Sequence, residues 1–346
     1  MYRDLLDIMA CPNCADDTHL ILESGAEHDG DVLEGWLKCP RCTSQWPVVR
    51  GIPRFVAEAQ NYAGNFAFEW ERWGRVQIDR FAGHSLSEQR FLADSRWSPE
   101  WMRGKLILDA GCGAGRFADV AARLGARVVA VDLSGAADAC RTNNAVHGPR
   151  MEVVQASFYA LPFRKDVFDG LYCMGVIQHT PDPERTMRVL PAYVKPEGRL
   201  VYNFYEVSAY SKAQPIKYAL RLVTPHLPNL ANHWLSLLLT TMLFPVTWLL
   251  SRIPKVRILN VAMPICASHD PALTLRQQFI WTLLDTFDWY SPRYENRQRH
   301  HEVANLLRKM GLKEVDSADG LAWAKRGDTP PLTTVTPVTP SAAPRR

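Results

Sequence analysis

Two pairs of cysteines stand near the start of the 346-residue chain. Cys11 and Cys14 belong to the segment CPNC, and Cys39 and Cys42 belong to CPRC. Each pair can present two thiolates from one tight turn, and two such pairs complete the tetrahedral site that Zn²⁺ prefers. We therefore expect a structural zinc ion with no open position for a catalytic water. The alternative is a disulfide or a redox-active pair. Two proline-containing turns favour this alternative less than they favour a zinc site.

A glycine-rich turn is the second chemical signal. The segment LILDAGCGAGRFADVAARLG (106–125) predicts a strand, a turn and a helix, with these residues in the motif D-x-G-x-G-x-G: Asp109, Gly111, Gly113 and Gly115. Glycine allows a sharp turn and a close approach of ligand to backbone. The next strand pattern, RVVAVD, ends at Asp132, where an acid can accept hydrogen bonds from ribose hydroxyls. A turn without a ligand and a nicotinamide site are the alternatives.

The elements that must position these residues alternate along 105–206. KLILD, RVVAVD, MEVVQA, VFDGLYCM and GRLVYNFY read as strands, and RFADVAARLG and DPERTMRVLPAYV read as helices. This alternation predicts an α/β fold with a parallel sheet covered by helices on both faces. Further on, HHEVANLLRKMG predicts a helix that ends at Gly311, and LKEVDSA and LAWAKR predict the last two strands.

The order of these motifs resembles the class I S-adenosylmethionine (SAM) dependent methyltransferases of the ubiquinone and menaquinone type. The matching segments are the glycine turn, Asp132, QASFYALPF, FDGLYCMGVIQHTPDPE and YVKPEGRLVYNFYE. The resemblance implies a Rossmann-like sheet and SAM as methyl donor. It implies that the glycine turn and Asp132 hold the donor's methionine and ribose, and that Ser157 and Phe158 lie near its adenine. Ser157 stands where many relatives have an acid, so its hydrogen bond would be weaker.

The same resemblance places the segment MGVIQHTPDP beside the transferred methyl group, which makes Gln178 and His179 the candidate catalytic residues. His179 is either a general base, since imidazole changes its charge near neutral pH, or a residue that shapes the pocket. A second segment, DTFDWYSPRYENRQRHHEV, could bind a polar or anionic acceptor through charge-assisted hydrogen bonds, or it is a solvated loop. Its candidate substrate residues are Tyr290, Arg293, Tyr294 and His300.

The N-terminal segment is similar to the small zinc-ribbon proteins that activate certain tRNA and release-factor methyltransferases. Both cysteine pairs and the ending WPVVRGIPRF carry this likeness, which implies a zinc-ribbon domain over 1–58. The aromatic block FAFEWERW follows in 59–104 and predicts a helical segment that covers the SAM pocket. Phe66, Trp70 and Trp73 could equally be core contacts.

An uncharged apolar run, HWLSLLLTTMLFPVTWLL, occupies residues 233–250. No acidic residue lies between Val207 and His269, and basic residues flank the run on both sides. These features favour an apolar and basic insert over 207–299, with a lid and peripheral membrane contact through 222–257. A buried helical cap is the second explanation. A membrane span, which needs about 20 apolar residues, is the third. Pro245 would also allow a re-entrant hairpin.

The remaining expectations concern organisation and function. We expect the methyltransferase core to cover 105–206 and 300–326, and 327–346 to be a disordered tail. The chain starts without a signal-peptide pattern and its paired cysteines suit a reducing compartment, so we expect a cytoplasmic protein, peripheral on the inner face of the membrane where it meets lipid. We expect methyl transfer from SAM to a small-molecule or lipid-linked acceptor.

Two other functions stay open. One is a ribosomal or transfer RNA methyltransferase whose zinc ribbon grips RNA. The net charge of +4 is modest and the basic residues cluster around apolar sequence, which disfavours a nucleic-acid partner. The other is a non-catalytic scaffold with a SAM fold that binds a protein partner. The complete glycine motif and Asp132 disfavour it.

Overall fold

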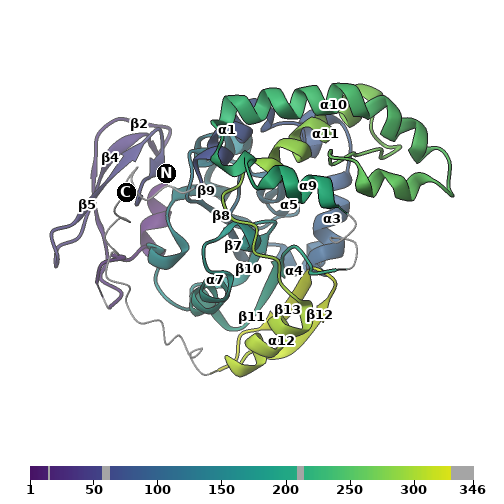
Figure 1. The fold of residues 1–346 in the computed structure, drawn as a ribbon. Helices are drawn as coiled ribbons and strands as arrows, with labels where there is room; N and C mark the ends of the chain where they lie inside the picture. Colours follow the sequence, from purple (N-terminus) through teal and green to yellow (C-terminus); the bar gives the residue numbers. More distant parts are fainter. Residues whose placement is uncertain (15, 57–62, 209–213, 329–346) are drawn as a thin grey trace, which may run out of the picture.

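The computed structural model of the protein describes residues 1–14, 16–56, 63–208 and 214–328. Figure 1 shows a small N-terminal β module, a central body built on one large sheet, and a layer of helices at the top of the view. The tail predicted to be disordered, 327–346, lies outside the described residues apart from Gly327 and Asp328.

A seven-stranded sheet forms the centre of the body, in the order β12-β13-β11-β10-β7-β8-β9. Neighbouring strands from β11 to β9 run parallel. β13 is antiparallel to both its neighbours, β11 and β12. The short turn at Asp319 and Gly320 joins β12 directly to β13, so these two strands form an antiparallel hairpin. The Rossmann-like α/β fold is thus confirmed, and one antiparallel strand is added to the predicted parallel sheet. The strands are β7 (Leu106–Ala110), β8 (Arg127–Asp132), β9 (Met151–Gln155), β10 (Phe168–Met174), β11 (Val194–Asn203), β12 (Lys313–Ala318) and β13 (Leu321–Lys325).

Alternate strand residues face two separate hydrophobic layers. Leu108 and Val129 face a layer that contains side chains of α7 (Pro183–Val189) and α12 (His300–Lys309). Ile107 and Val128 face the other layer, which α3 (Leu86–Ser95), α5 (Arg116–Arg123) and α6 (Ala136–Asn144) cover. Strands buried on both faces are apolar nearly throughout, which explains why the sequence pattern reveals them.

The N-terminal part, here called the ribbon module (residues 1–56), is built on a four-stranded antiparallel sheet. It docks on the edge strand β9, where the backbone N–H of Phe55 donates to the carbonyl of Gln155 at 2.8 Å. Its apolar residues Leu37 and Val48 belong to the same hydrophobic cluster as Leu108 of the large sheet. The ribbon module therefore shares its core with the central body. Its elements are η1 (Arg3–Ile8), β1 (Ile21–Ser24), β2 (Glu27–His28), β3 (Asp31–Val32), β4 (Glu34–Lys38), β5 (Gln45–Val49) and β6 (Ile52–Pro53).

The helical layer joins two distant parts of the chain. α1 (Gly64–Trp73), α2 (Asp79–Ala82) and α4 (Pro99–Met102) precede the large sheet in sequence, and α9 (Pro215–Arg221), α10 (Asn229–Ser251), η8 (Arg257–Ala262) and α11 (Leu275–Tyr290) follow β11. α11 contacts both α10 and α1, as Figure 1 shows. Trp73 lies in a small apolar cluster with Phe287, so this aromatic residue is a core contact.

α10 is one continuous helix, so the re-entrant hairpin at Pro245 is wrong. Contacts with α11 and η8 hold the helix along its length, and these contacts compensate for the backbone donor that proline lacks. Among the described residues, α10 is the one helix long and apolar enough to cross a membrane, and 22% of its most apolar window is buried.

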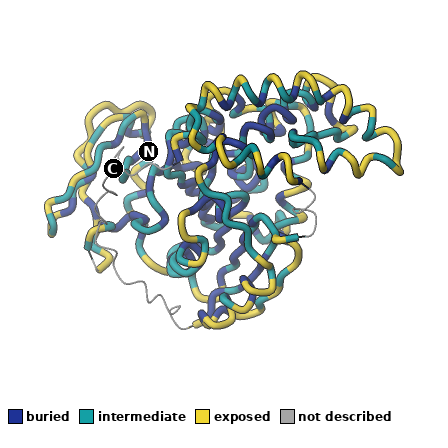
Figure 2. Tube along the Cα trace, in the orientation of Figure 1, coloured by how far each residue is buried: buried dark blue, intermediate teal, exposed yellow. Residues whose placement is uncertain are grey.

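An ordinary surface helix buries its apolar side chains and exposes its polar ones, and α10 does the opposite. Its exposed side chains recur every three or four residues, as the yellow stretches along the helix in Figure 2 show. We call this set the apolar face of α10: Leu230, Trp234, Leu238, Met242, Val246 and Leu249. The side chains buried against the protein are mostly polar: Asn232, Ser236, Thr240, Phe244 and Thr247. The helix thus presents hydrocarbon to the surroundings.

Candidate active site

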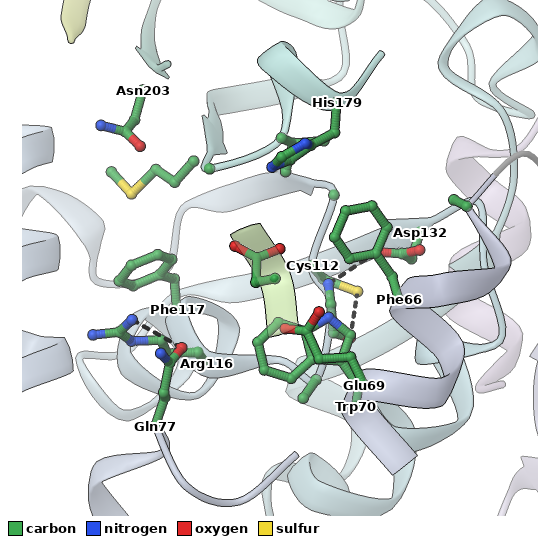
Figure 3. Close-up of a pocket in the computed structure, with 18 of the residues that line it drawn as sticks. Phe66, Glu69, Trp70, Gln77, Cys112, Arg116, Phe117, Asp132, His179 and Asn203 are labelled. Carbon is green, nitrogen blue, oxygen red and sulfur yellow. Dashed lines mark hydrogen bonds between the residues drawn. The ribbon is translucent and has the colours of Figure 1, made fainter. Parts of the chain in front are cut away.

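A cavity of about 360 Å³ lies at the carboxyl ends of the central strands. Its floor includes Asp109, Asp132, Met174 and Asn203, which end β7, β8, β10 and β11. α1 and α11 supply its other walls. Ligands of open α/β sheets bind at this edge, so the cavity is the candidate active site. Figure 3 shows His179 and Asn203 on one side, with Glu69, Trp70, Arg116 and Gln77 opposite.

The glycine turn after β7 needs glycine for steric reasons. Gly111 has φ of +93°, and a Cβ atom there would lie 2.4 Å from a methyl carbon of Val176. At Gly113, with φ of +51°, a Cβ atom would lie 2.9 Å from the indole nitrogen of Trp70. Both glycines line the cavity. Gly115 begins α5 outside the cavity lining, and a Cβ atom there would lie 2.1 Å from the side-chain nitrogen of Asn144.

Asp132 is oriented by three hydrogen bonds. One carboxylate oxygen accepts from the backbone N–H of Gly113 at 2.9 Å, and the other accepts from the N–H and hydroxyl of Ser134 at 2.8 and 2.7 Å. The carboxylate therefore ties the end of β8 to the glycine turn. It keeps lone pairs for further donors on the cavity side, as a ribose site requires.

Asp109 and the segment after β9 complete this side of the cavity. Asp109 is buried, and burial raises the pKa of its carboxyl group to about 8. Phe158 lines the cavity. The Ser157 hydroxyl accepts from the backbone N–H of Tyr159 at 3.3 Å and caps a short helix, and Ser157 is not among the lining residues.

His179 is positioned with one nitrogen available. Its Nδ1 lies 3.0 Å from the backbone carbonyl of Tyr294. A carbonyl can only accept, so Nδ1 carries a proton in this contact, and in the neutral ring Nε2 is then the nitrogen with the lone pair. The ring lies between those of Phe66 and Tyr205, with centroids at 5.3 and 5.5 Å, and it lines the cavity.

Gln178, the other candidate catalytic residue, points elsewhere. Its side chain is fully buried and does not line the cavity. Its backbone carbonyl accepts from the N–H of Asn296 at 2.7 Å. Gln178 therefore joins the His179 segment to the loop before α12.

The predicted substrate cluster lies around the cavity and does not line it. Tyr290 is buried, and its hydroxyl donates to the carbonyl of Pro264 at 2.9 Å. Arg293 is exposed and lies over the ring of Tyr294, and only the backbone of Tyr294 reaches His179. His300 begins α12, where its Nδ1 lies 3.1 Å from the hydroxyl of Ser317.

Three acids that sequence reasoning missed do line the cavity: Glu69 on α1, and Asp285 and Asp288 on α11. Burial raises the pKa of each carboxyl group, to about 7 for Asp285. A signal was available, since each acid interrupts an aromatic and apolar helical pattern. Phe66 and Trp70 of the same block also line the cavity, which favours their interpretation as a cover over the pocket.

Two arginines, Arg90 and Arg116, line the cavity together with these acids. Arg116 donates to the side-chain oxygen of Gln77 at 3.0 Å and to the hydroxyl of Ser87 at 2.9 Å. Burial lowers the pKa of its guanidinium group to about 9, so it stays charged at neutral pH. The cavity thus holds charge of both signs.

The four cysteines of the ribbon module meet at one point. Their sulfur atoms all lie within 4.8 Å of one another, with Cys11 and Cys42 at 3.5 Å and Cys14 and Cys39 at 3.7 Å. Tetrahedral Zn²⁺ with bonds of about 2.3 Å needs sulfur separations of about 3.8 Å. The residues therefore fit a four-thiolate zinc site.

Comparison with known proteins agrees with this geometry. Residues 108–202 match the family model of a methyltransferase domain. A ubiquinone biosynthesis O-methyltransferase of Albidiferax ferrireducens is 35% identical over 38% of this chain and 53% of its own length. The corresponding enzyme of Xanthomonas axonopodis is 30% identical over 41% of this chain and 59% of its own length. The chain thus spans little more than half of these relatives.

Among solved structures, the chain is similar to a magnesium protoporphyrin IX methyltransferase of Synechocystis, with 14% identity, a TM-score of 0.43 and coverage of 78% of this chain and 98% of the other. The family match covers residues 108–202, and the sheet order and the glycine turn agree with a methyltransferase domain there.

Proposed function

We propose that the protein transfers a methyl group from SAM to a small-molecule acceptor and releases S-adenosylhomocysteine. The main observation in support of this proposal is that Asp132, the glycine turn and the available nitrogen of His179 all face one cavity. SAM supplies a methyl group on a sulfonium sulfur, which is electrophilic without help from a metal.

The chain's own residues divide this work. Asp132 would accept hydrogen bonds from the ribose, Phe158 would contact the adenine, and Gly111 and Gly113 would let the backbone approach the methionine part. Asp109 would add a polar contact beneath the turn. The capping bond uses one lone pair of the Ser157 hydroxyl, and a contact with the adenine would use its O–H or its second lone pair. Gly115 would act by holding α5 in place.

His179 is the catalytic residue of this proposal. Its Nε2 would accept the proton that an oxygen or nitrogen acceptor loses as the methyl arrives. The carbonyl of Tyr294 holds the tautomer that this role needs. Gln178 would be a positioning residue, through its bond to Asn296. Substrate contacts from Tyr290, Arg293, Tyr294 and His300 stay a prediction, which their positions outside the cavity lining do not favour.

We also propose that the acceptor is lipid-linked and reached at an anionic membrane. The apolar face of α10 continues into the exposed Ile253, Ile258 and Leu259, and the exposed Arg252, Lys255 and Arg257 lie among them. Hydrocarbon surrounded by basic side chains complements a bilayer with negatively charged head groups. α10 packs on α11, and α11 lines the cavity, so a docked membrane would lie one helix away from the site.

A span by α10 would require its buried polar face to leave α11. Contact in the plane of the interface keeps that packing, so we favour a peripheral protein on the cytoplasmic side. The mixed apolar and basic character of this surface also favours lipid over RNA.

The ribbon module would hold one structural zinc ion through Cys11, Cys14, Cys39 and Cys42. In this proposal the metal stabilises the fold and takes no part in methyl transfer, because four thiolates complete its coordination.

The test follows a labelled methyl group. Purified protein and methyl-labelled SAM would be incubated with a total extract of host cells, which would then be separated into organic, RNA, protein and aqueous fractions. Label in the organic fraction, lost in His179→Ala, is the expected result. Label in RNA would overturn the acceptor class. No label in any fraction, together with no SAM binding in calorimetry, would overturn the methyltransferase function and favour a scaffold.

A further inference from the structure

The wall of the cavity that α1 and α11 supply is acidic. Glu69, Asp285 and Asp288 all line it, and none of them forms an ion pair within 4.0 Å among the described residues. The two aspartates accept long hydrogen bonds, from Gln77 to Asp285 and from Tyr205 to Asp288, each of 3.4 Å. Asp285 also accepts a side-chain hydrogen bond from Trp281. Three carboxyl groups here lack a strong partner within the protein.

Of the three acids, Glu69 is the one whose burial the protein compensates least. The residue is 0% exposed, and neither of its carboxylate oxygens has a hydrogen-bond partner in the described structure. Burial disfavours the charged form of a carboxyl group that has no partner, and it raises the pKa of Glu69. A positively charged group that enters the cavity would supply the missing partner and favour the charged carboxylate.

The surrounding surface also suits a cation. The cavity is lined by the aromatic rings of Phe66, Trp70, Phe117 and Trp289. The face of an aromatic ring attracts a cation. Arg116 already lies over the ring of Phe117 and Lys217 over that of Trp289, so Phe66 and Trp70 are the rings for a ligand cation. The arginines of the cavity are engaged elsewhere, Arg116 with Gln77 and Ser87, and Arg90 with Asp94. Both arginines act on Asp285 through space, and neither forms an ion pair within 4.0 Å with any of the three acids among the described residues.

We propose that Glu69, supported by Asp285 and Asp288, binds a protonated amine of the acceptor. The inference rests on the proposed function and names the acceptor's chemical class: an amphiphilic molecule with an alkylammonium group. The donor also carries an ammonium group, at its methionine end. We assign the acids to the acceptor because α1 and α11 lie outside residues 108–202, the part that matches the methyltransferase family model and contains Asp132 and Phe158.

The experiment compares a charged probe with a neutral isostere. Phenethylammonium and 2-phenylethanol would be titrated by calorimetry into the full-length protein saturated with S-adenosylhomocysteine. We expect the amine to bind at least about 10-fold more tightly than the alcohol, by analogy with other desolvated charge pairs. Glu69→Gln should remove this preference. Glu71→Gln, a change of the exposed acid on the same helix, should keep it.

Each other outcome overturns the assignment. Equal binding of both probes by the unchanged protein would refute the cation site. A loss of S-adenosylhomocysteine affinity in Glu69→Gln of 10-fold or more, with the amine preference retained, would assign the carboxylate to the donor. If Glu69→Gln does not fold, as judged by its circular dichroism, Asp288→Asn takes its place with the same expectations. Failure of the unchanged protein to bind S-adenosylhomocysteine would refute the proposed function instead.

Discussion

Replacing two side chains on the apolar face of α10 should detach the protein from membranes without unfolding it. Leu238 and Met242 lie one turn apart and are 54% and 66% exposed. Complete burial of such a side chain contributes about 1.5–3 kcal/mol, so the exposed part of each contributes about 1–2 kcal/mol on entering lipid. The variant Leu238→Ser/Met242→Ser should therefore lose about 2–4 kcal/mol of binding. This corresponds to an about 30- to 1,000-fold weaker partition.

The assay is co-sedimentation with vesicles of phosphatidylcholine, with and without phosphatidylglycerol. The unchanged protein should bind the anionic vesicles more strongly, and added salt should reduce this difference, because Arg252, Lys255 and Arg257 each add about 1 kcal/mol at a charged surface. The melting temperature of the variant should stay near that of the unchanged protein, since the replaced side chains face solvent. The control is Val146→Ser, which removes a side chain 69% exposed on η3 (Ala145–Arg150), away from α10. Unchanged partition of the double variant, or an equal loss in the control, would refute the reasoning.

Four further predictions address the site and the ribbon module. Asp132→Ala should weaken SAM binding in calorimetry by about 1–3 kcal/mol, because the ribose hydroxyls lose a charged acceptor, and an unchanged affinity would contradict the assignment. His179→Ala should lower kcat by about 10²–10⁴-fold with little effect on S-adenosylhomocysteine affinity; the reverse pattern would mark a binding role. Cys39→Ser should release the zinc ion and lower the melting temperature in one transition of the whole chain, whereas two separate transitions would argue against a shared core. Burial raises the pKa of Asp285 from 3.8 to about 7, so the ligand-free protein should lose stability as pH rises through that range. Urea unfolding of Asp285→Asn should show a smaller loss, and an equal loss would contradict the raised pKa.

The sequence reveals the central sheet and the donor side of the cavity because both depend on local patterns. A parallel strand buried on both faces is an apolar run, and the turn after it needs glycine where φ is positive. The positive φ of Gly111 and Gly113 and the spacing within each cysteine pair are local features. The close approach of Val176 and Trp70 to these glycines, and the meeting of the two cysteine pairs, depend on the tertiary fold.

The acceptor side is different, because residues far apart in sequence create it. Glu69 and Asp285 face one cavity although the chain between them forms most of the central sheet. No local pattern shows that α1 will lie against α11. The segment 285–303 suggested substrate contacts by composition alone. The structure places its acids Asp285 and Asp288 in the cavity lining, whereas the predicted Arg293 is exposed and does not line the cavity.

The orientation of α10 shows a second limit of composition. Apolar content indicates that 233–250 must avoid water, and it does not say which side of the helix the protein covers. The polar residues Asn232, Ser236 and Thr240 are buried against the protein. The side chain of Asn232 donates to the carbonyl of Thr224 at 2.8 Å, whereas the hydroxyls of Ser236 and Thr240 have no hydrogen-bond partner among the described residues. Tertiary packing decides which face of such a helix is buried and which is exposed.

The common core of the ribbon module and the large sheet has a consequence for how the two can be separated. Leu37 and Val48 belong to one hydrophobic cluster with Leu108 and Val129 of the body, so separating the module would divide that cluster. A zinc ribbon made as its own polypeptide would have to find such a partner by diffusion. In this chain the module and the body are covalently connected, so the effective concentration of each for the other is high and they need not meet by diffusion. Exchanging the module between enzymes would therefore require transfer of the edge of β9 as well.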